Sequence, residues 1–213
     1  MKKIALIVGI LIFAGIGFVG CYTIKADVLP ADYKGPAAER PILAPGDYWI
    51  YVQKDGGEVE WKFIRQEGDE LVFEGGKPRD KKRKDTLYTN LDLIPLKRVH
   101  GKTGEIIYEK KGGDAGYLNF PLWIGGKWYF SYNVISRDFN IPVPLDHSCG
   151  VISYKKIAVR AGSFEAFEIR CNWKARGYDD SGQDTYWYAP KAKHIIKYET
   201  EKSPRELLEY EVK

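Results

Sequence analysis

Histidine and cysteine are scarce in this sequence, with three of each among 213 residues. His100, His147 and His194 are spread along the chain, and no pair of ligands has the H-x-x-x-H or C-x-x-C spacing that is typical of zinc sites. We therefore expect no metal site and no cofactor.

Catalytic motifs are also lacking. In D-H-S-C, at 146–149, His147 and Cys149 are close enough in sequence for a nucleophile and its base. A loop histidine beside a buried or paired cysteine is the favoured interpretation. The acidic stretch Y-D-D-S-G-Q-D, at 178–184, has no downstream Glu at calcium-loop spacing and instead suggests an exposed hairpin turn. We expect a protein that is not an enzyme.

An excess of charge of one sign is missing as well. The formal net charge is +4, from 33 Lys and Arg against 29 Asp and Glu. Lys2 and Lys3 belong to an N-terminal leader that holds no acid, so the net charge of the remaining chain is only +2. So small an excess argues against a nucleic-acid partner.

Convincing amphipathic helices are absent after the leader, and apolar residues recur at every second position from Gly46 onward. The segments G-D-Y-W-I-Y-V-Q-K and E-V-E-W-K-F-I-R flank the turn sequence D-G-G. S-P-R-E-L-L-E-Y, at 203–210, fits either a short helix or a closing strand. Further turn sequences occur at 67–69, 101–104, 124–127, 161–163 and 180–183. The pattern predicts an all-β domain over 46–213, a single antiparallel meander of about ten strands that forms a curved open barrel or a sandwich.

The leader itself has a basic start, Lys2 and Lys3, followed by an apolar stretch from Ile4 to Phe18. It ends in F-V-G-C, which resembles the lipobox of bacterial lipoproteins, although Phe18 stands where Leu is most common. The resemblance implies a signal peptide over 1–20 and a lipid-modified Cys21. A signal-anchor helix with an incidental cysteine, or a secreted protein cut nearby, are the alternatives. The apolar stretch is shorter than the roughly 20 residues that span a bilayer comfortably.

Residues 21–45 contain four prolines, at positions 30, 36, 41 and 45, and show little periodicity. We expect a flexible, solvated tether that could hold the domain up to roughly 70 Å from the lipid. By resemblance to lipoprotein sorting in bacteria with two membranes, Tyr22 rather than Asp after the cysteine implies the outer membrane, with the domain in the periplasm. The membrane is then the first expected partner, through the N-terminal lipid.

Aromatic residues are abundant, with six Trp and 15 Tyr. They either fill a core or line a concave face that binds a lipid or another apolar ligand. For each residue alone, core packing is the favoured interpretation. The candidates on alternating segments are Trp49, Tyr51, Trp61, Phe63, Trp128, Phe130, Tyr132, Tyr186 and Tyr188.

Three segments carry a family resemblance: F-P-L-W-I-G-G-K-W at 120–128, K-I-A-V-R-A-G-S-F-E-A-F-E-I-R at 156–170, and D-T-Y-W-Y-A-P-K-A-K-H-I-I-K-Y-E at 184–199. They resemble a bacterial envelope family of unknown function with a V-P-A-G-T-F-like hairpin and a Y-W-Y-A-P strand. Arg160 and Ser163 replace Pro and Thr of that pattern. The resemblance implies a β-rich envelope protein, similar to the curved, lipid-accepting sheets of lipoprotein carriers, and no known catalysis.

The strongest local charge lies in K-P-R-D-K-K-R-K-D, at 77–85. A solvated loop is the favoured interpretation. A contact with anionic headgroups or an acidic partner protein is the functional alternative. The basic side chains that would make it are Lys77, Arg79, Lys81, Lys82, Arg83 and Lys84.

Cys149 and Cys171 are the cysteines outside the leader and its end. A hairpin turn centred on Gly162 places Cys171 opposite Ser153 and Cys149 about 13 Å away along the strand. A disulfide needs Cα atoms within about 7 Å, so we expect two separate buried thiols. The alternative is a disulfide, which would require the chain around Cys149 to fold back or a bulge to shift the register.

Two functions are consistent with these observations. The first is a lipid-anchored envelope protein that binds an apolar ligand on its aromatic face. The second is a structural or assembly protein of an envelope complex. A large continuous cavity would favour the first function, and a filled core would favour the second.

Overall fold

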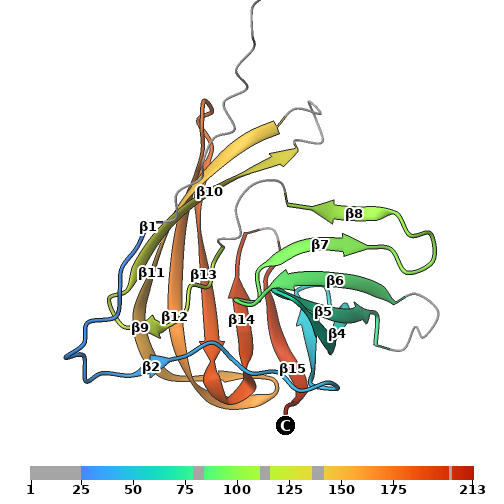
Figure 1. Cartoon of the computed structure of the whole chain (residues 1–213), viewed down its shortest axis with the longest axis horizontal. Coiled ribbons are helices and arrows are strands. Elements are labelled where there is room, and N and C mark those ends of the chain that lie inside the picture. Colours follow the sequence, from blue (N-terminus) through green and yellow to red (C-terminus); the bar gives the residue numbers. More distant parts are fainter. Residues whose placement is uncertain (1–24, 79–83, 111–115, 136–141, 202) are drawn as a thin grey trace, which may run out of the picture.

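The alternating segments of the sequence form strands in the structure, a computed structural model that describes residues 25–78, 84–110, 116–135, 142–201 and 203–213 (Figure 1). The strands are β1 (Lys25–Ala26), β2 (Ala37–Ala38), β3 (Tyr48–Gln53), β4 (Glu58–Glu67), β5 (Glu70–Gly76), β6 (Asp85–Asn90), β7 (Pro95–Val99), β8 (Ile106–Glu109), β9 (Leu122–Trp123), β10 (Lys127–Ile135), β11 (Pro142–Val159), β12 (Gly162–Ala175), β13 (Ser181–Ala189), β14 (His194–Glu199) and β15 (Arg205–Glu211). A short 3-10 helix, η1 (Pro190–Ala192), lies between β13 and β14. No helix within these ranges is long and apolar enough to cross a bilayer.

Thirteen of the strands form one antiparallel sheet, in the order β1-β10-β11-β12-β13-β14-β15-β3-β4-β5-β6-β7-β8. The sheet curls without closing, so the predicted all-β class is confirmed, and ten strands was an approximate count. The order contains two consecutive meanders, which are joined where the last strand, β15, pairs with β3. In Figure 1 the long strands β10 to β13 form one wall, and β4 to β8 form the facing wall.

Local sequence explains several strand ends. The predicted turns at 67–69, 101–104 and 124–127 join β4 to β5, β7 to β8 and β9 to β10. The turn predicted at 180–183 is displaced: the chain turns before β13, in a stretch that includes Y-D-D at 178–180, and residues 181–183 already belong to β13. The segment 203–210, which fitted a helix or a strand, enters β15 at Arg205.

The prediction of two separate buried thiols is wrong. Cys149 and Cys171 are directly opposite on β11 and β12, with Cα atoms 4.0 Å apart, and they form a disulfide. Cys171 therefore does not pair with Ser153, which lies opposite Glu168 instead.

The error has two causes in the β11–β12 hairpin. The tight turn is formed by residues 160–161, because Val159 already pairs with Gly162, whereas we had centred the turn on Gly162. A bulge at Ile152 then shifts the register by one more residue. A bulge adds a residue to one strand only, and alternation alone does not reveal it.

The described part of the predicted tether, from Lys25 to Pro45, is paired with the sheet at two places, although most of its side chains are exposed, as expected of a solvated segment. β1 pairs with β10, and β2 pairs with β9. The Tyr33 hydroxyl accepts a hydrogen bond from the Ile124 backbone nitrogen at 3.1 Å, and Ala38 is buried in the core. Small apolar residues between the prolines thus gain contacts with the sheet that a free chain would lack.

Candidate ligand-binding cavity

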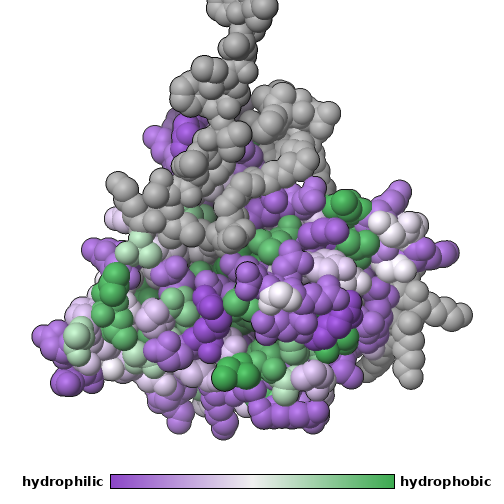
Figure 2. Space-filling view, viewed as in Figure 1, coloured by the Kyte–Doolittle hydropathy of each residue, from purple (hydrophilic) through white to green (hydrophobic). Residues whose placement is uncertain are grey.

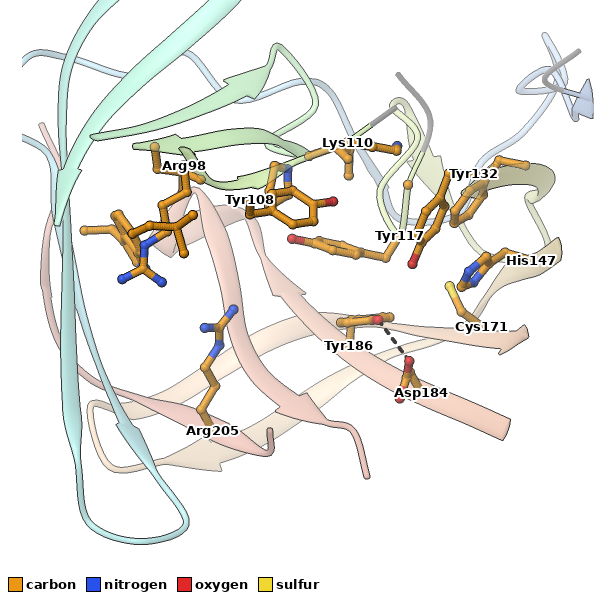
Figure 3. Close-up of a pocket in the computed structure, with 17 residues that line it drawn as sticks. Arg98, Tyr108, Lys110, Tyr117, Tyr132, His147, Cys171, Asp184, Tyr186 and Arg205 are labelled. Carbon is orange, nitrogen blue, oxygen red and sulfur yellow. Dashed lines mark hydrogen bonds between the residues drawn. The ribbon is translucent and has the colours of Figure 1, made fainter. Parts of the chain in front are cut away.

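A cavity of about 360 Å³ opens between the two walls of the curled sheet (Figure 3). Both walls contribute side chains to the cavity lining. Alternate residues of a strand share one face of the sheet, so side chains two residues apart can both line the cavity. Phe130 with Tyr132 on β10 and Asp184 with Tyr186 on β13 are such pairs. The lining residues are Trp61, Leu87, Ile94, Pro95, Arg98, Ile107, Tyr108, Lys110, Gly116, Tyr117, Phe130, Tyr132, His147, Cys171, Asp184, Tyr186 and Arg205.

Four of the aromatic residues singled out in the sequence line this cavity, and the others belong to the packed core. The cavity residues are Trp61, Phe130, Tyr132 and Tyr186. The core residues are Trp49, Tyr51, Phe63, Trp128 and Tyr188.

Three of the core aromatics also form hydrogen bonds within the fold through their polar atoms. Trp49 Nε1 donates to the Ala192 carbonyl at 2.7 Å, and Trp128 Nε1 donates to the Gly116 carbonyl at 2.8 Å. The Tyr51 hydroxyl donates to the Ile195 carbonyl at 2.7 Å. With their rings buried and their hydrogen bonds made, these side chains offer nothing to a ligand in the cavity.

One end of the cavity is a stack of rings. His147 lies directly opposite Phe130 in the ladder, and their ring centroids are 4.6 Å apart and nearly parallel. Tyr132 stacks on the same imidazole at 5.1 Å. Lys110 Nζ lies 5.2 Å from the centre of the Tyr132 ring. This histidine is on strand β11, not in the loop that we had expected.

The imidazole of His147 is neutral at physiological pH. Burial, followed by the charge of Lys110, lowers the pKa of His147 to about 4. Its Nε2 atom is buried and has no hydrogen-bond partner among the described residues. An unpaired buried polar atom costs about 1–3 kcal/mol, so a ligand group or a water that reached this atom would be bound favourably.

A row across three strands leads to the opposite end of the cavity, where Arg205 lies. Tyr186 on β13 is opposite Tyr198 on β14, which is opposite Arg205 on β15. Directly opposite residues share one face of a sheet, so all three side chains are on the concave side. The Arg205 guanidinium lies 3.9 Å from the centre of the Tyr198 ring and 5.4 Å from that of Tyr51. Arg205 Nε is buried and has no hydrogen-bond partner among the described residues.

The tyrosines of the cavity present neutral hydroxyl groups. Tyr117 stacks on Tyr186, with ring centroids 4.6 Å apart. Burial is the main cause that raises the pKa of Tyr132 to about 12, and it also raises those of Tyr117 and Tyr186. Each phenol can therefore donate and accept a hydrogen bond at neutral pH.

The facing wall contributes a cation that is already paired. Arg98 on β7 donates to the Asp85 carboxylate from Nη2 at 2.6 Å and from Nε at 3.0 Å. Its guanidinium also lies 5.3 Å from the centre of the Trp61 ring. Arg98 is thus held in place by its own partners.

Strand β8 forms an apolar lip at the free end of the sheet. Ile106, Ile107 and Tyr108 are 54%, 49% and 41% exposed, and the last two also line the cavity. Figure 2 shows a hydrophobic patch where Figure 1 draws β8, on a face that is otherwise largely hydrophilic. The lip therefore connects the cavity with the surroundings through apolar side chains.

Of the remaining predicted site residues, the structure describes only Lys77 and Lys84. Lys77 is exposed, and Lys84 Nζ lies 3.6 Å from Glu60 Oε2. Cys21, Arg79, Lys81, Lys82 and Arg83 lie outside the described residues. Within the described ranges, no group of three His, Cys, Asp or Glu side chains is arranged to hold a metal ion.

Sequence reasoning missed Arg205, His147 and Tyr117 as cavity residues. For Arg205 the sequence did contain a signal. Arg205 is two residues before Leu207 on the same strand, so both side chains are on the same face of the sheet, and Leu207 is fully buried. A charged residue on the apolar phase of a strand is unusual, because burying a charge is costly. Tyr117 follows a segment with no strand pattern and carried no such signal.

Comparison with solved structures finds a similar fold in a bacterial protein. No family model and no curated protein matches the chain. The fold is similar to that of YmcC. This hypothetical lipoprotein from Escherichia coli (K12) aligns over 81% of this chain and 89% of its own, with a TM-score of 0.53 and 12% identity. At such low identity the likeness to YmcC concerns the fold alone.

Two further solved structures align less closely. One is a candidate lipoprotein from Parabacteroides distasonis ATCC 8503, with 13% identity over 82% of this chain and 99% of that one and a TM-score of 0.41. The other is a candidate exported protein with a YmcC-like fold from Bacteroides fragilis NCTC 9343, with 12% identity over the same shares and a TM-score of 0.43.

Proposed function

We propose that this protein is a lipid-anchored, non-catalytic protein of the bacterial cell envelope that binds a small apolar ligand in the cavity between its two walls. The single observation that carries the ligand proposal is the cavity itself: about 360 Å³, lined mainly by aromatic and aliphatic side chains. Small-molecule sites have volumes of about 300–1,000 Å³ and a few convergent polar groups.

Attachment to a membrane is proposed on the leader and F-V-G-C, with Cys21 as the modified residue. The fold likeness to a hypothetical lipoprotein supports this proposal. Tyr22 after the cysteine favours the outer membrane, with the domain in the periplasm. Because β1 begins at Lys25, the chain between Cys21 and the sheet spans at most about 14 Å. The domain would then lie against the membrane rather than some 70 Å from it.

A neutral fluorescent dye, N-phenylnaphthylamine, tests the apolar site without involving charge. The mature chain from residue 21, with Cys21→Ser, keeps every contact described above and needs no detergent. We expect saturable binding of one dye per chain. Leu87→Trp, which adds bulk to the cavity lining, should weaken binding about 10-fold or more, whereas Val28→Trp, at an 87% exposed position, should not. A folded chain that shows no saturable binding would contradict the proposal.

The second candidate function is assembly with another envelope protein. It is favoured by the exposed apolar side chains on β8, since β8 is the last strand of the sheet and an edge can accept a further strand. Contact of the basic segment 77–84 with anionic headgroups or an acidic protein also stays a prediction.

A further inference from the structure

We propose that the ligand is a single-chain amphiphile with an anionic head, and that Arg205 binds the anionic group. This inference rests on the apolar-ligand function proposed above and adds the chemical class of the ligand. It starts from the charges around the cavity.

Arg205 is a cavity cation that has no acidic partner among the described residues. Arg98 is paired with Asp85, and Lys110 lies over the rings of Phe130 and Tyr132. No carboxylate in the described parts of the chain forms an ion pair with Arg205, and its buried Nε has no hydrogen-bond partner there. A guanidinium always carries its charge and presents donors in a planar fork that matches a carboxylate or a phosphate.

The position of Arg205 is fixed before any ligand arrives. Its guanidinium is held over the Tyr198 and Tyr51 rings, and Tyr51 is itself anchored by its hydrogen bond to the Ile195 carbonyl. Figure 3 shows the Arg205 side chain rising from β15 into the cavity. A donor that is already in position loses little conformational freedom on binding, which favours affinity.

The rest of the cavity suits an apolar chain. In Figure 3, Tyr117 and Tyr186 lie between Arg205 at one end and Tyr132 with His147 at the other. Aromatic faces and aliphatic side chains, such as those of Leu87 and Ile94, surround this path. A chain bound by its head at Arg205 would run over the tyrosine rings, and the apolar lip of β8 gives it access.

The size of the cavity limits the ligand to one chain. Its volume, about 360 Å³, is near the lower end of the range of small-molecule sites. A fatty-acid carboxylate and a single-chain phosphate ester share the chemistry that Arg205 would recognise. A two-chain phospholipid would be too large to be enclosed.

Calorimetric titration with three probes of the same chain length tests the inference on the unlipidated mature chain: dodecanoate, dodecanol and dodecyltrimethylammonium. We expect dodecanoate to bind about 10-fold or more tightly than dodecanol, and the cationic probe to bind most weakly. Titration with dodecyl phosphate then distinguishes the two anionic heads: tighter binding than dodecanoate identifies a phosphate ester, and weaker binding a carboxylate.

Arg205→Gln should remove the advantage of dodecanoate, so that dodecanoate and dodecanol bind this variant with similar affinity. The matched control is Arg160→Gln, which removes an exposed arginine that pairs with Glu206 outside the cavity; it should change neither affinity. If Arg205→Gln does not fold, the affinities of the unsubstituted chain for dodecanoate, dodecanol and dodecyltrimethylammonium still test the preference for an anionic head. Equal affinity for dodecanoate and dodecanol would overturn the inference while the apolar-ligand function stands, and binding of neither would refute that function itself.

Discussion

Cys149 on β11 and Cys171 on β12 face each other across the longest hairpin of the described chain and are joined by a disulfide. Cys171 also lines the cavity, next to Asp184 in the ladder. The bridge therefore links two strands of the cavity wall. Disulfides form and persist in oxidising compartments.

The first prediction concerns this bridge. The mature chain with Cys21→Ser, denatured without a reductant, should show no free thiol, because both remaining cysteines are bonded. Replacing both cysteines with Ala should lower the free energy of unfolding by about 2–4 kcal/mol, since the bridge closes a loop with a sequence separation of 22. Denaturant titration measures the change. Two reactive thiols per chain would contradict the pairing.

The second prediction concerns the anchor. If Cys21 is acylated, Cys21→Ser should abolish metabolic labelling with a fatty-acid analogue and leave unprocessed precursor in the membrane fraction. The double variant Cys149→Ser/Cys171→Ser is the matched control and should still be labelled. Normal labelling of the Cys21 variant would show that this cysteine is not the lipidation site.

The third prediction concerns the N-terminal segment. Because Ala38 is buried and β2 pairs with β9, Ala38→Asp should lower the free energy of unfolding by about 2–4 kcal/mol, as a charge enters the core. Val28→Asp, on the same segment but 87% exposed, should change it by less than about 0.5 kcal/mol. Thermal or urea unfolding compares the two. Equal stability of both variants would mean that the segment does not pack on the sheet in solution.

The fourth prediction separates core aromatics from cavity aromatics. Trp49→Phe removes a hydrogen bond to the Ala192 carbonyl and part of a buried ring, and should cost about 1–2 kcal/mol of stability without changing dye affinity. Tyr132→Ala should instead weaken dye binding, since Tyr132 lines the cavity. Binding and unfolding measurements on both variants test the division. A loss of affinity in the Trp49 variant alone would reverse our assignment.

The fifth prediction concerns pH. Burial lowers the pKa values of His147 and His194 to about 4, from the ordinary 6.5. As the pH falls from 6.5 toward 4, the unfolded chain binds protons that the folded chain does not, so stability decreases. Each histidine contributes on the order of 3 kcal/mol at most across this window.

His147→Phe tests the fifth prediction, because phenylalanine can keep the stack on Phe130 and Tyr132 but cannot titrate. The variant should lose less stability than the unsubstituted chain between pH 7 and pH 5, and His194 should account for part of the remaining slope. Urea titrations at several pH values give both slopes. An unchanged slope would show that His147 titrates normally in the folded protein.

The sequence by itself determined the all-β class, several of the strands and part of the core. Period-two alternation in segments such as 47–53 and 58–65 is a local property, and short Gly-containing turns mark where a strand must reverse. Trp49, Tyr51 and Phe63 on these segments are buried in the structure. Local chemistry also led to the expectation of a lipid-modified Cys21, which stays a prediction.

Only the tertiary structure decided how the strands are ordered and what they enclose. The pairing of β15 with β3 joins strands from opposite ends of the domain, and no local pattern specifies such a partner. The bulge at Ile152 and the turn at 160–161 set the register that brings Cys149 to Cys171. The cavity depends on the same long-range pairing, since Arg205 reaches it only because β15 lies between β14 and β3. The alternation of apolar residues indicates on which face of the sheet a side chain lies, whereas the curl of the sheet determines which other residues lie across from that face.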